Sequence, residues 1–215
     1  MRAGQRLLAQ DGYEVCLFPC EAMYVTNGEH GVLALDFGPR DTAGERISPM
    51  NCYAPFSGSV VYTGNDHNLI LESDNLVHMP DGSLQYGRVL VAHSWIAPTL
   101  GQHFTQGQLF YKTGDYGQST AEHLHMEIAR VPKKTTRKWN ESGIGLYNAI
   151  HMWNGMYVND TTILYGGGFN WHTYQGGVTP SPAGYGRKTD FPWVLYYNRL
   201  RRKRRWSYEL NRDYW

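Results

Sequence analysis

The sequence predicts an all-β protein. Turn-forming residues are dense, with 24 Gly and 10 Pro in 215 residues. The segments between them are short and rich in Val, Leu, Ile, Tyr and Phe, which favour strands. No segment before residue 130 has the apolar periodicity of an amphipathic helix. A hydrophobic content of 41% is enough for the core of one domain of this length.

Seven short segments before residue 130 are expected to form strands of an antiparallel sheet. The clearest pair flanks Pro80-Asp81-Gly82-Ser83, a turn sequence in which proline and glycine favour a reversal of the chain. The expected strands lie within "GVLALDFG" (31–38), "GSVVYTG" (58–64), "NLILESD" (68–74), "NLVHMP" (75–80), "LQYGRVLVAHS" (84–94), "GQLFYKTG" (107–114) and "HLHMEIA" (123–129).

Composition changes after Arg130. A polar connector, "VPKKTTRKWNESG", is followed by an aromatic, glycine-rich region, and six of the seven Trp lie beyond Arg130. Aromatic side chains at this density favour an ordered, β-prone extension. Its expected strands lie within "AIHMWNGMYV" (149–158), "TTILYG" (161–166) and "WVLYYN" (193–198). The chain is therefore divided into an N-terminal segment (1–27), a central domain (28–130) and an aromatic extension (131–215).

The charge balance excludes some classes of function. The formal net charge is only +1, so the overall field of a nucleic-acid-binding protein is missing and no nucleic-acid partner is expected. Six basic residues between Arg199 and Arg205 are interpreted as a solvated end of the chain, with contact to a polyanion as the alternative. The apolar run after Arg2 and Arg6 is too short for a secretory leader, and no later run would span a membrane.

The cysteines do not indicate a disulfide scaffold. Cys16, Cys20 and Cys52 are an odd number in a chain of this length, and the spacing of the first two is not the usual CxxC of a zinc site. Buried thiols are expected, with a small structural metal cluster as the alternative.

Two histidines one residue apart, in "GQSTAEHLHMEIA" (117–129), suggest a metal site. Alternate residues of a strand share one face, so His123 and His125 point the same way about 7 Å apart. Alone, such a pair is weak evidence, because paired surface histidines are common in sheets. His30 and Asp36 are an even number of residues apart and share a face if their strand is regular. Two His and one Asp suit Zn²⁺ and leave a fourth position for water.

Four motifs resemble the lysostaphin-like (LytM-type) zinc endopeptidases of peptidoglycan. "APFSGSVVYTG", "VLVAHSW", "GQHFTQGQLFYKTG" and "GQSTAEHLHMEI" occur in the order of that family's "YAP..G.V", "YxH", "G..V..GQ.I...G" and "GxSTGxHLHFE". The resemblance covers roughly residues 28–130. It implies a LytM-like peptidase fold.

The resemblance also implies roles for individual residues. The zinc ligands would be His30, Asp36 and His125, and the catalytic pair would be His93 and His123. The family usually has three residues between its first ligand pair, whereas "HGVLALD" has five, so the reach from His30 to Asp36 is longer than in the family. Glu122 and Glu127 flank the histidine pair and could orient an imidazole.

The remaining histidines are interpreted as surface or core-edge residues, with no part in the site. They are His67, His78, His103, His151 and His172.

The expected activity is zinc-dependent cleavage of peptide bonds in bacterial peptidoglycan. Because the target is extracellular and no leader is expected, a bacteriophage tail-associated lysin in the virion is the preferred interpretation. The extension would then contact other tail proteins, with wall binding as the alternative. Two further alternatives are an endolysin, moving from the host cytoplasm to the wall, and a catalytically inactive LytM-like component of the tail.

Overall fold

A computed structural model describes residues 1–31, 33–97, 99–176 and 181–185, and the backbone alone of the last range. Across these residues the chain is almost entirely β, which confirms the predicted class. One short helix is described, α1 (Met152–Gly155). The strands are β1 (Glu14–Val15), β2 (Ala22–His30), β3 (Ala34–Phe37), β4 (Asn51–Tyr53), β5 (Gly58–Thr63), β6 (Leu69–His78), β7 (Leu84–Ala92), β8 (His103–Phe104), β9 (Leu109–Lys112), β10 (Leu124–Val131), β11 (Ala149–Ile150), β12 (Thr162–Tyr165), β13 (Asn170–Thr173) and β14 (Ser181–Tyr185).

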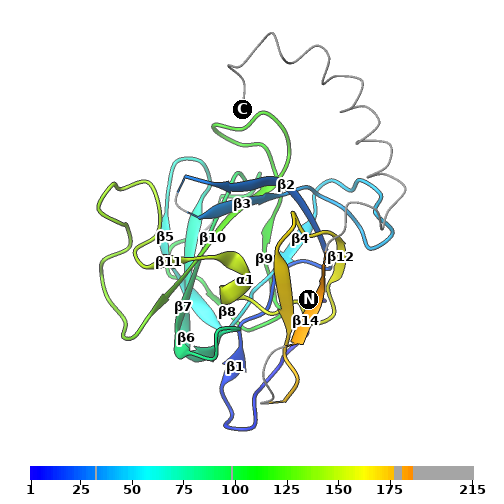
Figure 1. Cartoon of the computed structure of the whole chain (residues 1–215). Coiled ribbons are helices and arrows are strands. Elements are labelled where there is room, and N and C mark those ends of the chain that lie inside the picture. Colours follow the sequence, from blue (N-terminus) through cyan, green and yellow to red (C-terminus); the bar gives the residue numbers. More distant parts are fainter. Residues whose placement is uncertain (32, 98, 177–180, 186–215) are drawn as a thin grey trace.

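The main sheet of the described chain has the order β12-β2-β3-β10-β7-β6-β5-β8. β1 joins it beside β6 and β11 joins it beside β10. Most neighbours are antiparallel, whereas β1 with β6 and β12 with β2 are parallel. β2 and β3 run across the top of Figure 1 while β6 and β7 run down one side, so the sheet coils strongly around its core.

The hairpin β6–β7 forms at the predicted turn. The amide of Gly82 donates to the carbonyl of Met79 at 2.9 Å, and Gly82 has a φ of 83°, which glycine adopts without steric cost. The two segments expected over 68–74 and 75–80 are one strand, β6, with a register shift between Glu72 and Leu76. A bulge of this kind bends a strand without ending it.

β10 lies between β3 and β7 and supplies one wall of the core. Leu124, Met126 and Ile128 are fully buried, as alternation along a strand predicts. His125 and Glu127 therefore point to the opposite face of the strand. The site described below is built on that face.

The three thiols are buried and not joined in disulfides. The sulfur atoms of Cys20 and Cys52 lie 3.6 Å apart. This agrees with the expectation of buried thiols. All three side chains belong to the main hydrophobic core.

The extension packs on the main sheet through several elements. β12 pairs with β2, β11 pairs with β10, and the fully buried Trp171 contacts Phe18 and Phe37. The segment 149–158 was expected to be a strand and is instead the short β11 followed by α1, which corrects that expectation. The domain boundary at residue 130 stays a prediction. The expected strand at 193–198 and the basic run Arg199 to Arg205 lie outside the described residues.

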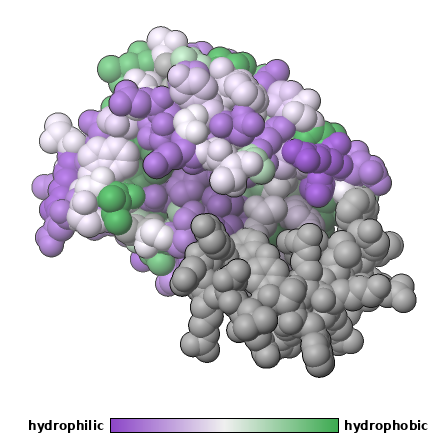
Figure 2. Space-filling view, turned by 90° about the horizontal axis from the view of Figure 1, so that it is seen from above, coloured by the Kyte–Doolittle hydropathy of each residue, from purple (hydrophilic) through white to green (hydrophobic). Residues whose placement is uncertain are grey.

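Figure 2 views the molecule from above, toward the end that carries β2 and β3, and shows hydrophilic residues gathered around the middle of this face. No helix in the described ranges has the length and apolar character needed to cross a membrane.

Candidate metal and catalytic site

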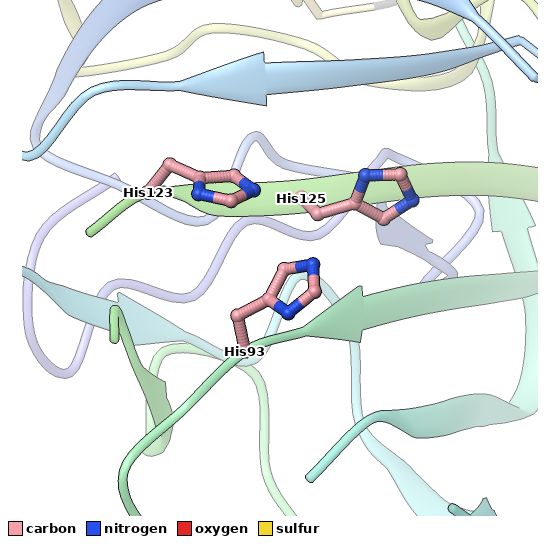
Figure 3. Close-up of side chains that lie close together, drawn as sticks. All are labelled: His93, His123 and His125. Carbon is pink, nitrogen blue, oxygen red and sulfur yellow. The ribbon is translucent and has the colours of Figure 1, made fainter. Parts of the chain in front are cut away.

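The structure brings all five predicted site residues together, from four places in the chain. His30 ends β2 and Asp36 lies on β3. His93 directly follows β7, while His123 directly precedes β10 and His125 lies within it. In Figure 3 the imidazole of His93 points from the end of its strand toward those of His123 and His125.

Strand register explains this convergence. His125 lies opposite Asp36 of β3 on one side and opposite Ala92 of β7 on the other. The residue after Ala92 is His93, so β10 carries the histidine pair between a carboxylate strand and an imidazole strand. Side chains opposite one another in antiparallel strands are close enough to interact directly.

One carboxylate oxygen lies at the centre of the group. Oδ1 of Asp36 is 3.1 Å from Nδ1 of His125, 3.6 Å from Nε2 of His30 and 3.7 Å from Nε2 of His123. The ligand atoms of His30, Asp36 and His125 all lie within 4.8 Å of one another. Those of His93, His123 and His125 do so as well.

The long spacing between His30 and Asp36 is absorbed by an irregular hairpin. His30 pairs with Ala34, Asn27 pairs with Asp36, and the register shifts between these pairs. Gly31 and Leu33 adopt positive φ values of 55° and 63°, which close the turn within few residues. The extra residues therefore extend the turn, and both side chains still reach the site.

Three of the four imidazoles are held by backbone carbonyls. Nδ1 of His30 lies 2.9 Å from the carbonyl oxygen of Gly28, and Nδ1 of His93 lies 2.9 Å from that of Tyr116. Nδ1 of His123 lies 2.7 Å from the carbonyl oxygen of Ala121. A carbonyl oxygen only accepts, so each Nδ1 carries the proton. In the neutral ring this leaves the lone pair on Nε2, which can bind a metal or exchange a proton.

The His93–His123 pair depends on a strained turn. Their ring centroids are 4.8 Å apart, and His93 has a φ of 77°, which is uncommon for any residue with a side chain. Gly114 packs against this turn so closely that a Cβ there would lie 2.3 Å from the carbonyl oxygen of His93. Gly114 also accepts a backbone hydrogen bond from His123, so one glycine contacts both residues.

Burial and neighbouring groups shift the ionisation of the site in the metal-free chain. Burial would raise the pKa of Asp36, but the hydrogen bond from His125 and the surrounding imidazoles hold it below its ordinary value. Burial would likewise lower the pKa of His125, but Asp36 and then Glu127 raise it to about 9. Burial lowers the pKa of His93. The hydrogen bond to the Tyr116 carbonyl opposes this shift, and the neighbouring imidazoles of His123 and His125 add to it.

The donor set of His30, Asp36 and His125 fits a zinc ion. Two imidazole nitrogens and one carboxylate oxygen are ligands that zinc takes in catalytic sites. The separations of 3.1 and 3.6 Å from Oδ1 of Asp36 are near the roughly 3.4 Å expected between ligands about 2.1 Å from one tetrahedral ion. The residues therefore meet without rearrangement of the strands.

Several contacts of the site could not be read from the motifs. Nδ2 of Asn27 lies 3.3 Å from Oδ2 of Asp36, which provides the carboxylate with a second partner. Glu122 accepts a hydrogen bond from the hydroxyl of Thr113. His67 stacks on Tyr116, whose carbonyl holds His93.

The other histidines contact groups outside the five-residue site. His78 pairs with Asp11, His103 with Asp74 and His151 with Glu29.

Comparisons with known proteins find similarity at low identity. No family model matches the chain. Over 172 residues it is 24% identical to "Morphogenesis protein 1" of Bacillus phage B103, covering 75% of this chain and 45% of that protein. The chain thus spans less than half the length of this relative.

Two solved structures illustrate the structural similarity. A zinc-containing peptidase from Vibrio cholerae is 18% identical, with a TM-score of 0.38, over 58% of this chain and 43% of that one. The catalytic domain of the antimicrobial peptidase lysostaphin from Staphylococcus simulans is 20% identical, with a TM-score of 0.34, over 55% of this chain and 80% of that one.

Proposed function

We propose that the protein is a zinc-dependent endopeptidase that cleaves peptide bonds of bacterial peptidoglycan. The observation that carries the proposal is the convergence of His30, Asp36 and His125 beside a second pair of imidazoles, His93 and His123. The four motifs that resemble the lysostaphin-like family support the substrate class.

In this proposal His30 and His125 bind zinc through nitrogen and Asp36 through oxygen. When bound, zinc supplies Lewis acidity, which polarises a carbonyl and acidifies water. Two neutral imidazoles and one carboxylate leave a net positive charge at the centre. Zinc held by these three residues would supply a positive charge that favours negative charge on a carbonyl oxygen.

His93 and His123 provide proton transfer and hydrogen bonding to the reacting groups. Their Nδ1 atoms are held by carbonyls, so each ring presents Nε2 in a fixed direction. Imidazole titrates close to neutrality, which suits a group that takes a proton from water and returns one to the leaving amine. Anchoring at Nδ1 keeps each ring oriented while this exchange takes place.

We further infer that the enzyme acts as part of a phage virion and opens the wall during infection. The support is the similarity to a protein named for morphogenesis in a Bacillus phage. A surface of the aromatic extension would then contact other tail proteins. Release from the host cytoplasm as an endolysin is the alternative localisation.

Mass spectrometry of fragments released from purified Gram-positive cell walls tests the activity. The wild-type chain is compared with chelated protein and with chelated protein to which zinc is restored. New peptide termini should appear, vanish on chelation and return with zinc, and they would identify the bond. Intact walls in the presence of bound zinc would contradict the proposal and favour a binding or structural role.

A further inference from the structure

A buried carboxylate, Glu127, lies beside His125 on the same face of β10, at the ring nitrogen that does not face Asp36. Glu127 is only 2% exposed and points to the same face of β10 as His125. Its Oε1 is 3.9 Å from Nε2 of His125, whose Nδ1 faces Asp36. The imidazole of His125 is therefore flanked by one carboxylate at each nitrogen.

The second oxygen of Glu127 binds the chain beyond the strand. Oε2 accepts the amide hydrogen of Leu146 at 2.8 Å, and the contact is buried. A buried carboxylate is costly unless its oxygens have partners, so this hydrogen bond fixes the side chain. The separation of 3.9 Å between Oε1 of Glu127 and Nε2 of His125 is longer than a hydrogen bond. The carboxylate therefore acts on the ring through charge attraction, which orients it.

Leu146 is itself held firmly. Its side chain is fully buried and packs with Ile70, Leu90 and Ala129. Its backbone forms an isolated bridge with Trp139. The amide that Glu127 accepts from is thus part of a packed layer on the same face of the sheet as His125.

A second contact joins the extension to the other histidine ligand. Nδ1 of His151 lies 2.6 Å from Oε1 of Glu29, the residue immediately before His30. The ring of His151 stacks on Trp153 at 4.3 Å, and Trp153 stacks on Phe169 at 4.3 Å. This aromatic stack ties the end of β2 to the extension.

We propose that Glu127 is a positioning residue for His125, and that contacts with residues 139–153 hold in place the two strands that carry His30 and His125. The metal site of this chain then includes a support that lies beyond the HxH motif. Outer partners that orient metal-bound histidines typically change metal affinity by about 10- to 100-fold. The inference rests on the zinc ligand set proposed above.

The test measures zinc affinity of the full chain by competition with a chromophoric chelator. Glu127→Gln keeps the size of the side chain and an acceptor for Leu146, but it removes the charge that faces His125. Glu72→Gln is the matched control, because Glu72 is also buried and pairs with Arg88. Arg88 in turn donates hydrogen bonds to the carbonyls of Thr135 and Arg137, in the segment after β10. Both changes disturb contacts with the segment after β10, and only one faces a ligand.

Glu127→Gln is expected to lower zinc affinity by about 10-fold or more and to alter the visible spectrum of the cobalt-substituted protein. Glu72→Gln should leave both readouts within about threefold of wild type at a temperature where circular dichroism shows a folded chain. An unchanged affinity and spectrum in Glu127→Gln would overturn the positioning role. His125→Ala separates the two proposals. Loss of zinc in His125→Ala together with normal zinc binding in Glu127→Gln would support the ligand set and overturn the positioning role of Glu127.

A surface variant tests the second contact without risk to the core. His151→Phe keeps a ring for Trp153 and removes the hydrogen bond to Glu29. His78 ends β6, outside the five-residue site, and His78→Phe removes its similar exposed pair with Asp11. Zinc affinity should fall in the first variant and stay unchanged in the second, and an equal effect in both would exclude support through Glu29.

Discussion

His125 lies directly opposite Asp36 in the ladder between β10 and β3, and Nδ1 of the imidazole is 3.1 Å from Oδ1 of the carboxylate. The two residues are 89 positions apart in the chain. Their contact exists because β3 and β10 are neighbours in the sheet, and no local pattern fixes that pairing.

Removal of single imidazoles should separate metal binding from turnover. His125→Ala should lose zinc, because it removes one of three ligands. His123→Ala should retain zinc and lose about 100- to 10,000-fold in turnover, the usual contribution of a general acid or base. Zinc content after dialysis and the rate of peptide release from walls give the two readouts. Full zinc and full activity in the His125 variant would exclude the ligand assignment.

Gly114→Ala should impair catalysis and spare the metal. A Cβ at this position would lie 2.3 Å from the carbonyl oxygen of His93, so the turn that carries His93 must shift. A misplacement of about 1 Å in a catalytic group can cost about 100-fold in rate. Zinc affinity should stay close to wild type, because Gly114 contacts none of the proposed ligands. Equal losses of zinc and rate would point to general unfolding instead.

The buried Trp171 should contribute strongly to stability although it lies in the extension. Trp171→Ala removes the contacts with Phe18 and Phe37 and should cost about 3–5 kcal/mol in the free energy of unfolding. Trp95→Ala is the control, because Trp95 is 58% exposed and its loss should change stability by no more than about 0.5 kcal/mol. Chemical denaturation measures both. Similar losses in the free energy of unfolding for the two variants would contradict a hydrophobic core shared by the extension and the main sheet.

The three cysteines should be inert in the folded protein. Burial raises the pKa of Cys16 and Cys52 far above the ordinary range, and the reactive species is the thiolate. Alkylation followed by intact mass should therefore show no modification at about pH 8 without denaturant and three modified thiols after unfolding. Rapid modification of the native chain would show that the thiols are accessible.

The Asp11–His78 pair should give a pH-dependent contribution to stability. Desolvation opposes ionisation of Asp11, but hydrogen bonds from His78 and from the amide of Tyr13 lower its pKa below the ordinary 3.8. A carboxyl with a depressed folded pKa stabilises the fold above its unfolded pKa, and the contribution disappears as pH falls through the folded value. The difference between wild type and Asp11→Asn should shrink as pH falls through the acid range in which Asp11 becomes protonated in the folded protein. A difference that grows in acid would give the opposite sign and exclude this explanation.

Most strands of residues 58–131 were predictable because their signals are local. Turn residues and short apolar runs delimit β5, β7, β9 and β10, and the turn at Pro80–Ser83 forms as its proline and glycine require. β6 was expected as two strands, and the segment of β8 was expected to be a turn. The shared face of His123 and His125 follows from strand periodicity alone. Buried thiols followed from the composition.

The prediction of a strand over residues 149–158 was wrong because a contact with a distant part of the chain decides the conformation of this segment. A Cβ on Gly155 would lie 2.7 Å from the side chain of Ile128. Glycine at position 155 therefore lets the backbone of α1 approach β10 more closely than a residue with a side chain would. That approach turns an apolar segment into one helical turn against the sheet. Its own residues carry no sign of it, since periodicity cannot distinguish a short buried strand from a short buried helix.

The sequence by itself determined the all-β class, most strands of the central domain and the identity of the residues that could serve a metal site, because these depend on patterns within a few residues. Only the tertiary structure decided that Asp36 meets three imidazoles, that the extra residues after His30 form a turn, and that Glu127 joins His125 to Leu146. Those relationships are set by which strands become neighbours and in what register. Neighbours and register follow from burial of the whole core, which no short stretch of sequence contains.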